Sequence, residues 1–327
     1  MCYTGAEAWT SAPAVAAGYK ENDMENSKRK RFIKTQLTWY SFIIISLVTI
    51  LVFNYIPMFT SLKYSLYDIS VIGFDEKFIG FGNYKILLSS DTFHKAIWNT
   101  FGLAFCSLLS IPIGFILATL INGIGQGKAQ SLFRIGYYLP NIITGVSVIL
   151  VFQVVLKANG GLLNNFLSFI TRQEVNIGWL TDSKHSWQGA TILNVWQNLG
   201  YAMLMNLASL QSIPTEIYEA AEIDGASPFQ RWLYITIPHM TSCFAFLLIT
   251  NIINGMARFT DLFIIGGNSS SGRPGGTLQT ILMYVYQFSF ESPQYGIASA
   301  GAMILFVLTF VVTMINLKMT GFFKKKS

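Results

Sequence analysis

Six apolar segments constrain this 327-residue chain more than any other feature of its sequence. Each is about 20 residues or longer, the length at which an α-helix crosses roughly 30 Å of hydrocarbon. The composition agrees, because 12% of the residues are charged, whereas a soluble domain usually has about 25%. The mean hydropathy is +0.46. We therefore predict an all-α membrane protein with six transmembrane helices, at Leu37–Phe59, Ile97–Ile121, Leu132–Leu156, Trp187–Leu210, Met240–Ile265 and Ile297–Phe322.

Basic residues at the ends of these segments indicate the orientation, because Lys and Arg are retained on the cytoplasmic side. Five basic residues lie within residues 28–34, and Lys324, Lys325 and Lys326 follow the last span. We therefore expect both termini in the cytoplasm. Residues 1–34 are expected to form a disordered basic tail without a secretory signal, in which Met24 is an alternative start. Residues 323–327 form a second basic tail.

The sequence offers no motif for chemistry on a substrate. The three cysteines and three histidines are scattered, without the spacing of a metal site. A phosphate-binding loop needs Ser or Thr after its Gly-Lys pair, and Gly127-Lys128 is followed by Ala129. The net charge of +6 is distributed at span ends, which suits membrane lipid headgroups and not nucleic acid.

The segment between the fourth and fifth spans, residues 212–238, has the pattern of two short helices with a corner. Pro214 suits a first helical turn, and Gly225 suits a helix end, since glycine readily adopts the left-handed conformation. Ser227, with a glutamine three residues later, is a capping-box pattern that begins the second helix, and Pro238 is expected to end it. Such a segment is typical of an amphipathic linker on lipid and also of a docking site for a partner protein.

The same segment resembles the EAA loop of permease subunits in binding-protein-dependent ABC importers. That loop reads E-A-A, three residues, G, nine residues and I-x-L-P, and Glu219-Ala220-Ala221, Gly225 and Ile235-Thr-Ile-Pro238 fit it, with Ile237 in place of Leu. Four further stretches look like the carbohydrate branch, similar to the larger maltose-permease subunit and its oligosaccharide and glycerol-phosphate relatives: Leu210–Pro214, Asp224–Ala226, Phe78–Tyr84 and Asn99-Thr100. The resemblance covers roughly residues 35–322.

The resemblance implies a type I ABC importer permease fold over residues 35–322, in which the loop 212–238 docks as a coupling helix on a cytoplasmic ATPase. The coupling residues it implies are Glu219, Ala220, Ala221, Asp224, Gly225, Ile235 and Pro238. It also implies the other partners: a second homologous permease subunit, two ATPase subunits that bind Mg-ATP, and an extracytoplasmic solute-binding protein.

In this interpretation the chain is a multi-pass subunit of a bacterial plasma membrane, without enzymatic activity, metal or cofactor of its own. It imports a carbohydrate by alternating access, an oligosaccharide by expectation, with an anionic glycan such as a uronide among the candidates. The alternatives are a permease of the same fold for glycerol phosphate or a peptide, and a membrane enzyme or channel.

Polar residues within two of the spans are candidates for the substrate pathway, because polar groups at membrane depth usually face a bundle interior or a watery cavity. Amides, rings and hydroxyls suit sugars, although interhelical hydrogen bonding is the alternative role. Arg258 either pairs with Asp261 or stays free for an anionic substrate. In the fifth span the polar residues are expected to share one helical face. The candidates are Trp196, Gln197, Asn198, Tyr201, Asn251, Asn254, Arg258 and Asp261.

Overall fold

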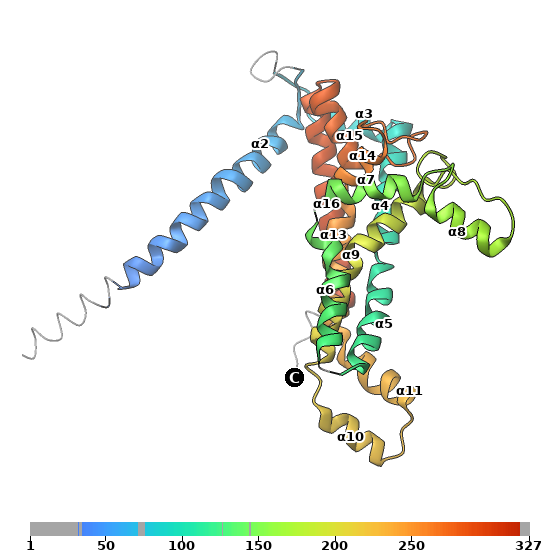
Figure 1. Ribbon diagram of the computed structural model, residues 1–327. Helices are drawn as coiled ribbons and strands as arrows, with labels where there is room; N and C mark the ends of the chain where they lie inside the picture. Colours follow the sequence, from blue (N-terminus) through green and yellow to red (C-terminus); the bar gives the residue numbers. More distant parts are fainter. Residues whose placement is uncertain (1–31, 33–34, 71–75, 126, 144, 321–327) are drawn as a thin grey trace, which may run out of the picture. The chain divides into compact units, whose positions relative to one another are not determined.

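The computed structural model describes residues 32, 35–70, 76–125, 127–143 and 145–320, and the chain divides into two units, residues 1–60 and 61–327. The two predicted tails lie outside the described residues, apart from Phe32. A helix of 30 residues, Thr35–Tyr64, contains the first predicted span. It includes a π-helical segment, η1 (Leu51–Tyr55), followed by α2 (Ile56–Tyr64), which is drawn in blue in Figure 1.

The described part of the second unit is mostly helical (Figure 1). Its strands, β1 (Tyr67–Asp68) and β2 (Lys77–Phe78), form one antiparallel pair. In chain order the helices are α3 (Gly82–Leu88), α4 (Asp91–Ser107), α5 (Ser110–Gly123), α6 (Lys128–Ile142), α7 (Gly145–Val155), α8 (Leu162–Thr171), α9 (Ser186–Leu210), α10 (Thr215–Ile223), α11 (Pro228–Arg231), η2 (Trp232–Thr236), α12 (Ile237–His239), α13 (Thr241–Met256), α14 (Thr260–Ile265), α15 (Ile281–Tyr286), η3 (Gln287–Glu291) and α16 (Tyr295–Met319).

Three of the described helices are long and apolar enough to cross a membrane: Thr35–Tyr64, Asp91–Gly123 and Tyr295–Met319. Two bent pairs raise the number to five, α6 with α7 at 98° and Pro228–His239 with α13 at 59°. The helix α9 is long enough at 25 residues, but its asparagines and glutamine lower its apolarity. The described helices are therefore consistent with six spans, and that count stays a prediction.

The fifth predicted span, Met240–Ile265, is interrupted. The helix α13 ends at Met256, and α14 begins at Thr260. In the break, the Arg258 carbonyl accepts a hydrogen bond from the Thr280 hydroxyl at 3.0 Å. The single helical face that we predicted for the polar residues of this span therefore ends before Arg258, because a contact from a distant segment holds the backbone out of the helix.

Glycines set the closest helix contacts. A β-carbon on Gly200 of α9 would lie 2.1 Å from the Tyr137 carbonyl oxygen of α6, and one on Gly255 of α13 would lie 2.9 Å from Ala104 Cα of α4. Helix association in lipid lacks a strong hydrophobic driving force and depends on such close backbone contact. The pairs α9–α6 and α13–α4 are therefore packed without room for a side chain at these points.

The connection between α14 and α15 is held against α4 and α9. Asn99 Nδ2 donates to the carbonyls of Gly276 and Gln279 at 2.9 Å each, and Trp187 Nε1 donates to the Thr277 carbonyl at 2.7 Å. This connection lies at the opposite end of the second unit from α10 and α11 (Figure 1). The unit thus has two ends, which we call the elbow end, after residues 212–238, and the loop end.

Candidate functional site

The elbow, residues 212–238, contains the two helices and the glycine corner that the sequence predicts. The first helix, α10, has Pro214 at its N-cap and not within its first turn. It ends at Gly225, whose φ is 79°, and the Ala226 N–H donates to the Ala221 carbonyl at 2.9 Å. This is the bond of a Schellman-type helix end, which favours glycine at the left-handed position. The corner is therefore a fixed local structure.

The second helix of the elbow opens with the predicted capping box. The Ser227 N–H donates to Gln230 Oε1 at 2.7 Å, and the Gln230 N–H donates to Ser227 Oγ at 3.3 Å. The helix then widens into the π turn η2, where the Ile237 N–H donates to the Trp232 carbonyl. Pro238 lies in the last turn of this continuous helix, which ends at His239 and is followed by a bend of 59° into α13. The predicted end therefore holds to within one residue.

Aromatic contacts attach the elbow to the long helices. The Tyr218 hydroxyl lies 2.9 Å from Thr236 Oγ1 and joins the two arms. The Trp232 indole stacks on Phe115 of α5, with centroids 5.6 Å apart, and Phe115 meets Phe244 of α13 edge-on at 5.0 Å. The elbow is therefore attached to α5 and α13 through closely packed rings.

The structure brings four of the seven predicted coupling residues together around one hollow. A hollow of about 380 Å³ on the elbow is lined by Ala221, Asp224, Gly225 and Ile235, together with Arg231 and Tyr234. Glu219 and Ala220 are exposed on α10, and Pro238 is exposed on α12. At the tip, Ile223 is 88% exposed. The elbow therefore presents an open hollow beside an apolar tip, which is the form of a docking surface.

Arg258 and Asp261 form a buried ion pair at the break between α13 and α14. The Arg258 Nε and Nη2 atoms lie 3.0 and 2.5 Å from Asp261 Oδ2, and Nη2 also donates to the Ala190 carbonyl of α9 at 3.1 Å. The two side chains are 5% and 14% exposed. Of the two alternatives for Arg258, this geometry favours the pair over the free cation. Its Nη1 atom is buried without a hydrogen-bond partner among the described residues.

Asn251 uses its amide within the bundle. Its Nδ2 donates to the Leu247 carbonyl at 2.9 Å, and its Oδ1 accepts a bond from the Ser110 hydroxyl of α5 at 3.3 Å. Asn251 therefore has the interhelical role that was the alternative to substrate contact. Asn198 donates to the Asn194 carbonyl at 2.9 Å within α9.

The other predicted pathway residues are more accessible. Trp196 is 40% exposed, and its ring lies 4.9 Å from that of Phe152 on α7. Gln197 and Tyr201 are half-buried on α9, and Asn254 is exposed on α13. The structure thus divides the predicted set into an accessible group on α9 and α13 and an internal group made of Asn251 and the ion pair.

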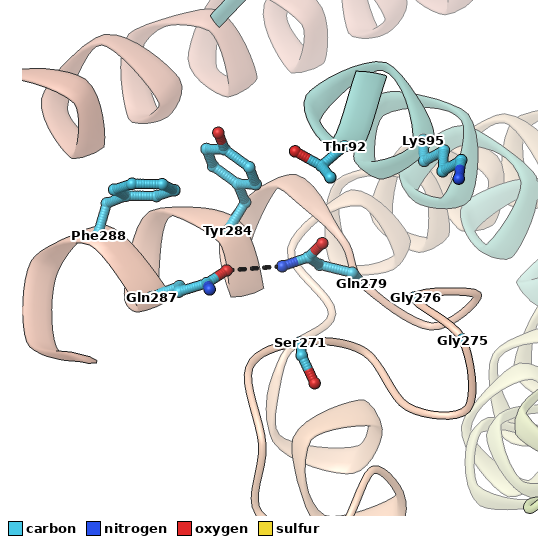
Figure 2. A pocket seen from close by; sticks show the side chains of 9 residues that line it. All are labelled: Thr92, Lys95, Ser271, Gly275, Gly276, Gln279, Tyr284, Gln287 and Phe288. Carbon is cyan, nitrogen blue, oxygen red and sulfur yellow. Dashed lines mark hydrogen bonds between the residues drawn. The ribbon is translucent and has the colours of Figure 1, made fainter. Parts of the chain in front are cut away.

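A pocket of about 280 Å³ lies at the loop end, between α4, the α14–α15 connection and η3 (Figure 2). Gln279 Nε2 donates to Gln287 Oε1 at 2.9 Å, which leaves the Gln287 amide nitrogen available. Tyr284 and Phe288, with ring centroids 4.7 Å apart, provide an apolar wall. Lys95 adds a positive charge, and none of the lining residues is acidic. The pocket therefore suits a polar or anionic group.

Sequence reasoning missed the residues that attach these sites to the bundle. Phe115 lies among apolar residues, where the sequence carries no local signal that separates a contact from lipid-facing surface. Ser110 lies in the same span, and its polarity is the signal that could have marked it as facing the bundle. Lys95 precedes the second predicted span and carries no motif of its own. Its role at the pocket depends on the fold of the α14–α15 connection, which contacts α4 across about 180 residues of sequence.

Comparison with known proteins identifies the family. Residues 110–319 match the binding-protein-dependent transport system inner membrane component family. The chain is 30% identical to the multiple sugar-binding transport system permease protein MsmF of Streptococcus mutans, over 87% of this chain and 96% of that protein. It is also 30% identical to the arabinooligosaccharides transport system permease protein AraP of Bacillus subtilis, over 76% and 77% of the two chains.

The fold has a solved counterpart in a bacterial ABC transporter involved in the import of the acidic polysaccharide alginate. The TM-score is 0.76 at 26% identity, and the match covers 90% of this chain and 99% of that one. These findings confirm the type I importer permease fold and an integral membrane protein that is a transporter subunit and not an enzyme. The chain belongs to the binding-protein-dependent transport system inner membrane component family, the permease subunits of ABC importers.

Proposed function

We propose that this chain is one of two homologous permease subunits of an importer that moves an oligosaccharide across a bacterial plasma membrane. Two copies of a cytoplasmic ATPase and an extracytoplasmic solute-binding protein complete the assembly. The relatives named for sugars support the cargo class: MsmF, AraP and the trehalose/maltose permease MalF of Thermococcus litoralis, which is 30% identical over 86% of this chain. The basic residues beside the first and last spans support cytoplasmic termini.

The elbow is the observation that carries the transport mechanism. Its capped helices and aromatic attachment to α5 and α13 make it stiff, and its hollow stays open. We propose that the ATPase, which holds the Mg-ATP, docks on Glu219, Ala220, Ala221, Asp224, Gly225, Ile235 and Pro238. Closure of the ATPase pair then displaces the elbow, and the helices attached to it change between inward-open and outward-open arrangements.

The accessible polar residues are the proposed sugar contacts. Trp196, Gln197, Asn198, Tyr201 and Asn254 offer a ring, amides and a hydroxyl, the groups that bind sugar hydroxyls and C–H faces. The ion pair positions the backbone beside them. A uronide remains the anionic candidate, supported by likeness to the alginate importer and not by Arg258, whose charge is compensated.

The loop end is the proposed contact for the solute-binding protein. A similar solved complex contains an alginate pentasaccharide-bound periplasmic protein. In this chain, the segment 266–296, which includes α15 and η3, and the pocket lined by Lys95 and Gln287 offer ammonium and amide donors at the end opposite the elbow. That position is where an external protein reaches the permease if the elbow faces the cytoplasm.

Reconstitution of the full complex in proteoliposomes tests the proposal. We expect solute-binding protein loaded with an oligosaccharide to stimulate ATP hydrolysis and drive uptake, while glycerol phosphate, a peptide and unloaded binding protein do not. Stimulation by the peptide alone would show that the importer carries a peptide and not an oligosaccharide. Activity without any ATPase partner would favour a channel and overturn the proposal.

Two elbow variants test the coupling residues. Gly225→Pro cannot adopt the positive φ of the corner, and Glu219→Lys reverses an exposed charge. We expect both to abolish ATP-driven uptake while the protein still inserts in the membrane. Glu216→Lys, which reverses an exposed charge at the start of the same helix, is the matched control and should retain uptake. Full transport by both test variants would remove the coupling assignment.

A further inference from the structure

On α8 the large apolar side chains are exposed and a polar side chain is buried, which is the reverse of a surface helix that faces water. Four large apolar side chains point away from the rest of the unit: Leu162 (64% exposed), Phe166 (59%), Phe169 (83%) and Ile170 (60%). Their spacing of four, three and one residues places them on one helical stripe. Asn164, on the opposite side of the helix, is 1% exposed. No residue of α8 is charged.

Asn164 fixes this inverted orientation. Its Nδ2 donates to the Ala158 carbonyl at 2.8 Å and to the Ile177 carbonyl at 2.9 Å. Its Oδ1 accepts a bond from Trp179 Nε1 at 2.8 Å. The buried amide therefore has its hydrogen-bonding capacity used on both sides, as buried polar groups require. The apolar stripe is the outward face of a clamped hairpin, and rotation of α8 would break three bonds.

The preceding helix also has exposed apolar side chains. On α7 the outward residues are Val146 (47% exposed), Leu150 (53%), Val151 (60%) and Val154 (66%), and α7 has no charged residue. The exposed charged residues nearest to α8 are Lys157, five residues before its start, and Arg172 and Glu174, directly after its end. An apolar stripe with flanking cations is the pattern of a helix that lies in a membrane interface.

A protein partner fits this stripe less well than lipid does. A stable protein interface has about one hydrogen bond per 100–200 Å², and the four side chains of the stripe contain no donor or acceptor. Acyl chains require none. The exposed cations match the phosphates of a headgroup layer. The occupant that agrees with both the stripe and the cations is a phospholipid monolayer.

We infer that α8 lies in the bilayer interface at the loop end, with its stripe among acyl chains and with Lys157 and Arg172 at the phosphates. The helix then anchors the hairpin between α7 and α9 to the membrane surface. This inference does not depend on which solute the complex carries.

Site-directed spin labelling of the complete complex in phospholipid nanodiscs tests the inference. Nitroxides are attached to Phe169→Cys and to Thr171→Cys, after the native cysteines are replaced by serine. Thr171→Cys is the matched control, because it lies two residues further along and on the other side of the helix. Thr171 is exposed on the side of α8 opposite the stripe. We expect collisions with dissolved oxygen to exceed collisions with a water-soluble nickel chelate at Phe169→Cys, and the reverse at Thr171→Cys.

Two results would overturn the inference. Higher accessibility to nickel than to oxygen at Phe169→Cys would place the stripe in water. Low accessibility to both reagents would show that protein covers the stripe. Constant protection would indicate the second permease subunit, and protection that appears only when the solute-binding protein is added would indicate that protein. A measurement on the unmodified chain supports the label data: a phospholipid with a photoreactive acyl chain should crosslink to residues 162–170, and absence of such adducts counts against the inference.

Discussion

The ion pair between Arg258 and Asp261 allows a quantitative prediction. Asp261→Asn keeps the shape of the side chain but removes the charge that faces a guanidinium with 5% exposure. Breaking a buried pair from one side leaves an uncompensated charge and costs about 3–5 kcal/mol. The bond that Arg258 Nη2 donates to the Ala190 carbonyl remains, but the carbonyl supplies no negative charge to compensate the guanidinium.

The expected loss is visible in thermal unfolding of the purified complex. A domain of 150–250 residues loses roughly 2–4 °C per kcal/mol, so Asp261→Asn should lower the unfolding temperature by roughly 6–20 °C. The double variant Arg258→Met, Asp261→Leu removes both charges, and we expect it to be close to the wild type. Asn254→Ala, an exposed neighbour, is the control. A double variant as unstable as the single one would refute the pairing argument.

The same ion pair also leads to a prediction about which oligosaccharides are transported. Since the charge of Arg258 is compensated within the chain, Arg258→Ala should reduce uptake of acidic and neutral oligosaccharides by the same factor. A loss confined to the acidic oligosaccharide would show that the guanidinium leaves Asp261 to meet the substrate.

Three further predictions concern packing, coupling and the loop end. Gly200→Val must separate α9 from α6 and should lower the free energy of unfolding by about 1–3 kcal/mol, measured as thermal stability. Gly136→Val, with nothing within 4 Å of its β-carbon, should leave the stability unchanged. Equal stability of the two variants would contradict the close contact. Tyr218→Phe removes the bond to Thr236, worth about 1 kcal/mol, and should lower the sugar transported per ATP, unlike Tyr234→Phe at a residue 73% exposed. Lys95→Glu should weaken stimulation of ATP hydrolysis by loaded solute-binding protein and leave basal hydrolysis intact, and a normal response would exclude the pocket from docking.

The elbow could be predicted in detail because its signals are local. Gly225 determines a corner through its own φ, and Ser227 caps a helix through a residue three positions away. The end of the second arm follows from a local signal too, because the helix ends at His239, one residue after Pro238. The π turn that precedes Pro238 was not predicted, since no local rule indicates it.

The break in the fifth span could not be predicted, because its cause is distant in sequence. Arg258 is held by the Ala190 carbonyl, 68 positions away, and its own carbonyl by Thr280, 22 positions away. Periodicity alone continues the helix through these residues. Likewise, the exposure of the apolar side of α8 could not be predicted. It depends on hydrogen bonds from Asn164 to the Ala158 and Ile177 carbonyls, which lie close to Asn164 only in the folded hairpin.

The position of the accessible polar residues explains how the elbow can act on them. Trp232 of the elbow stacks on Phe115 of α5, and α5 meets α9 where a β-carbon on Gly114 would lie 2.8 Å from that of Ala202. Ala202 directly follows Tyr201, the last of the proposed sugar contacts on α9. A displacement of the elbow therefore crosses two tight contacts before it reaches the pathway, and neither contains a flexible side chain that could absorb it. Enlarging Gly114 should consequently uncouple ATP hydrolysis from uptake even though the residue touches neither the ATPase nor the sugar.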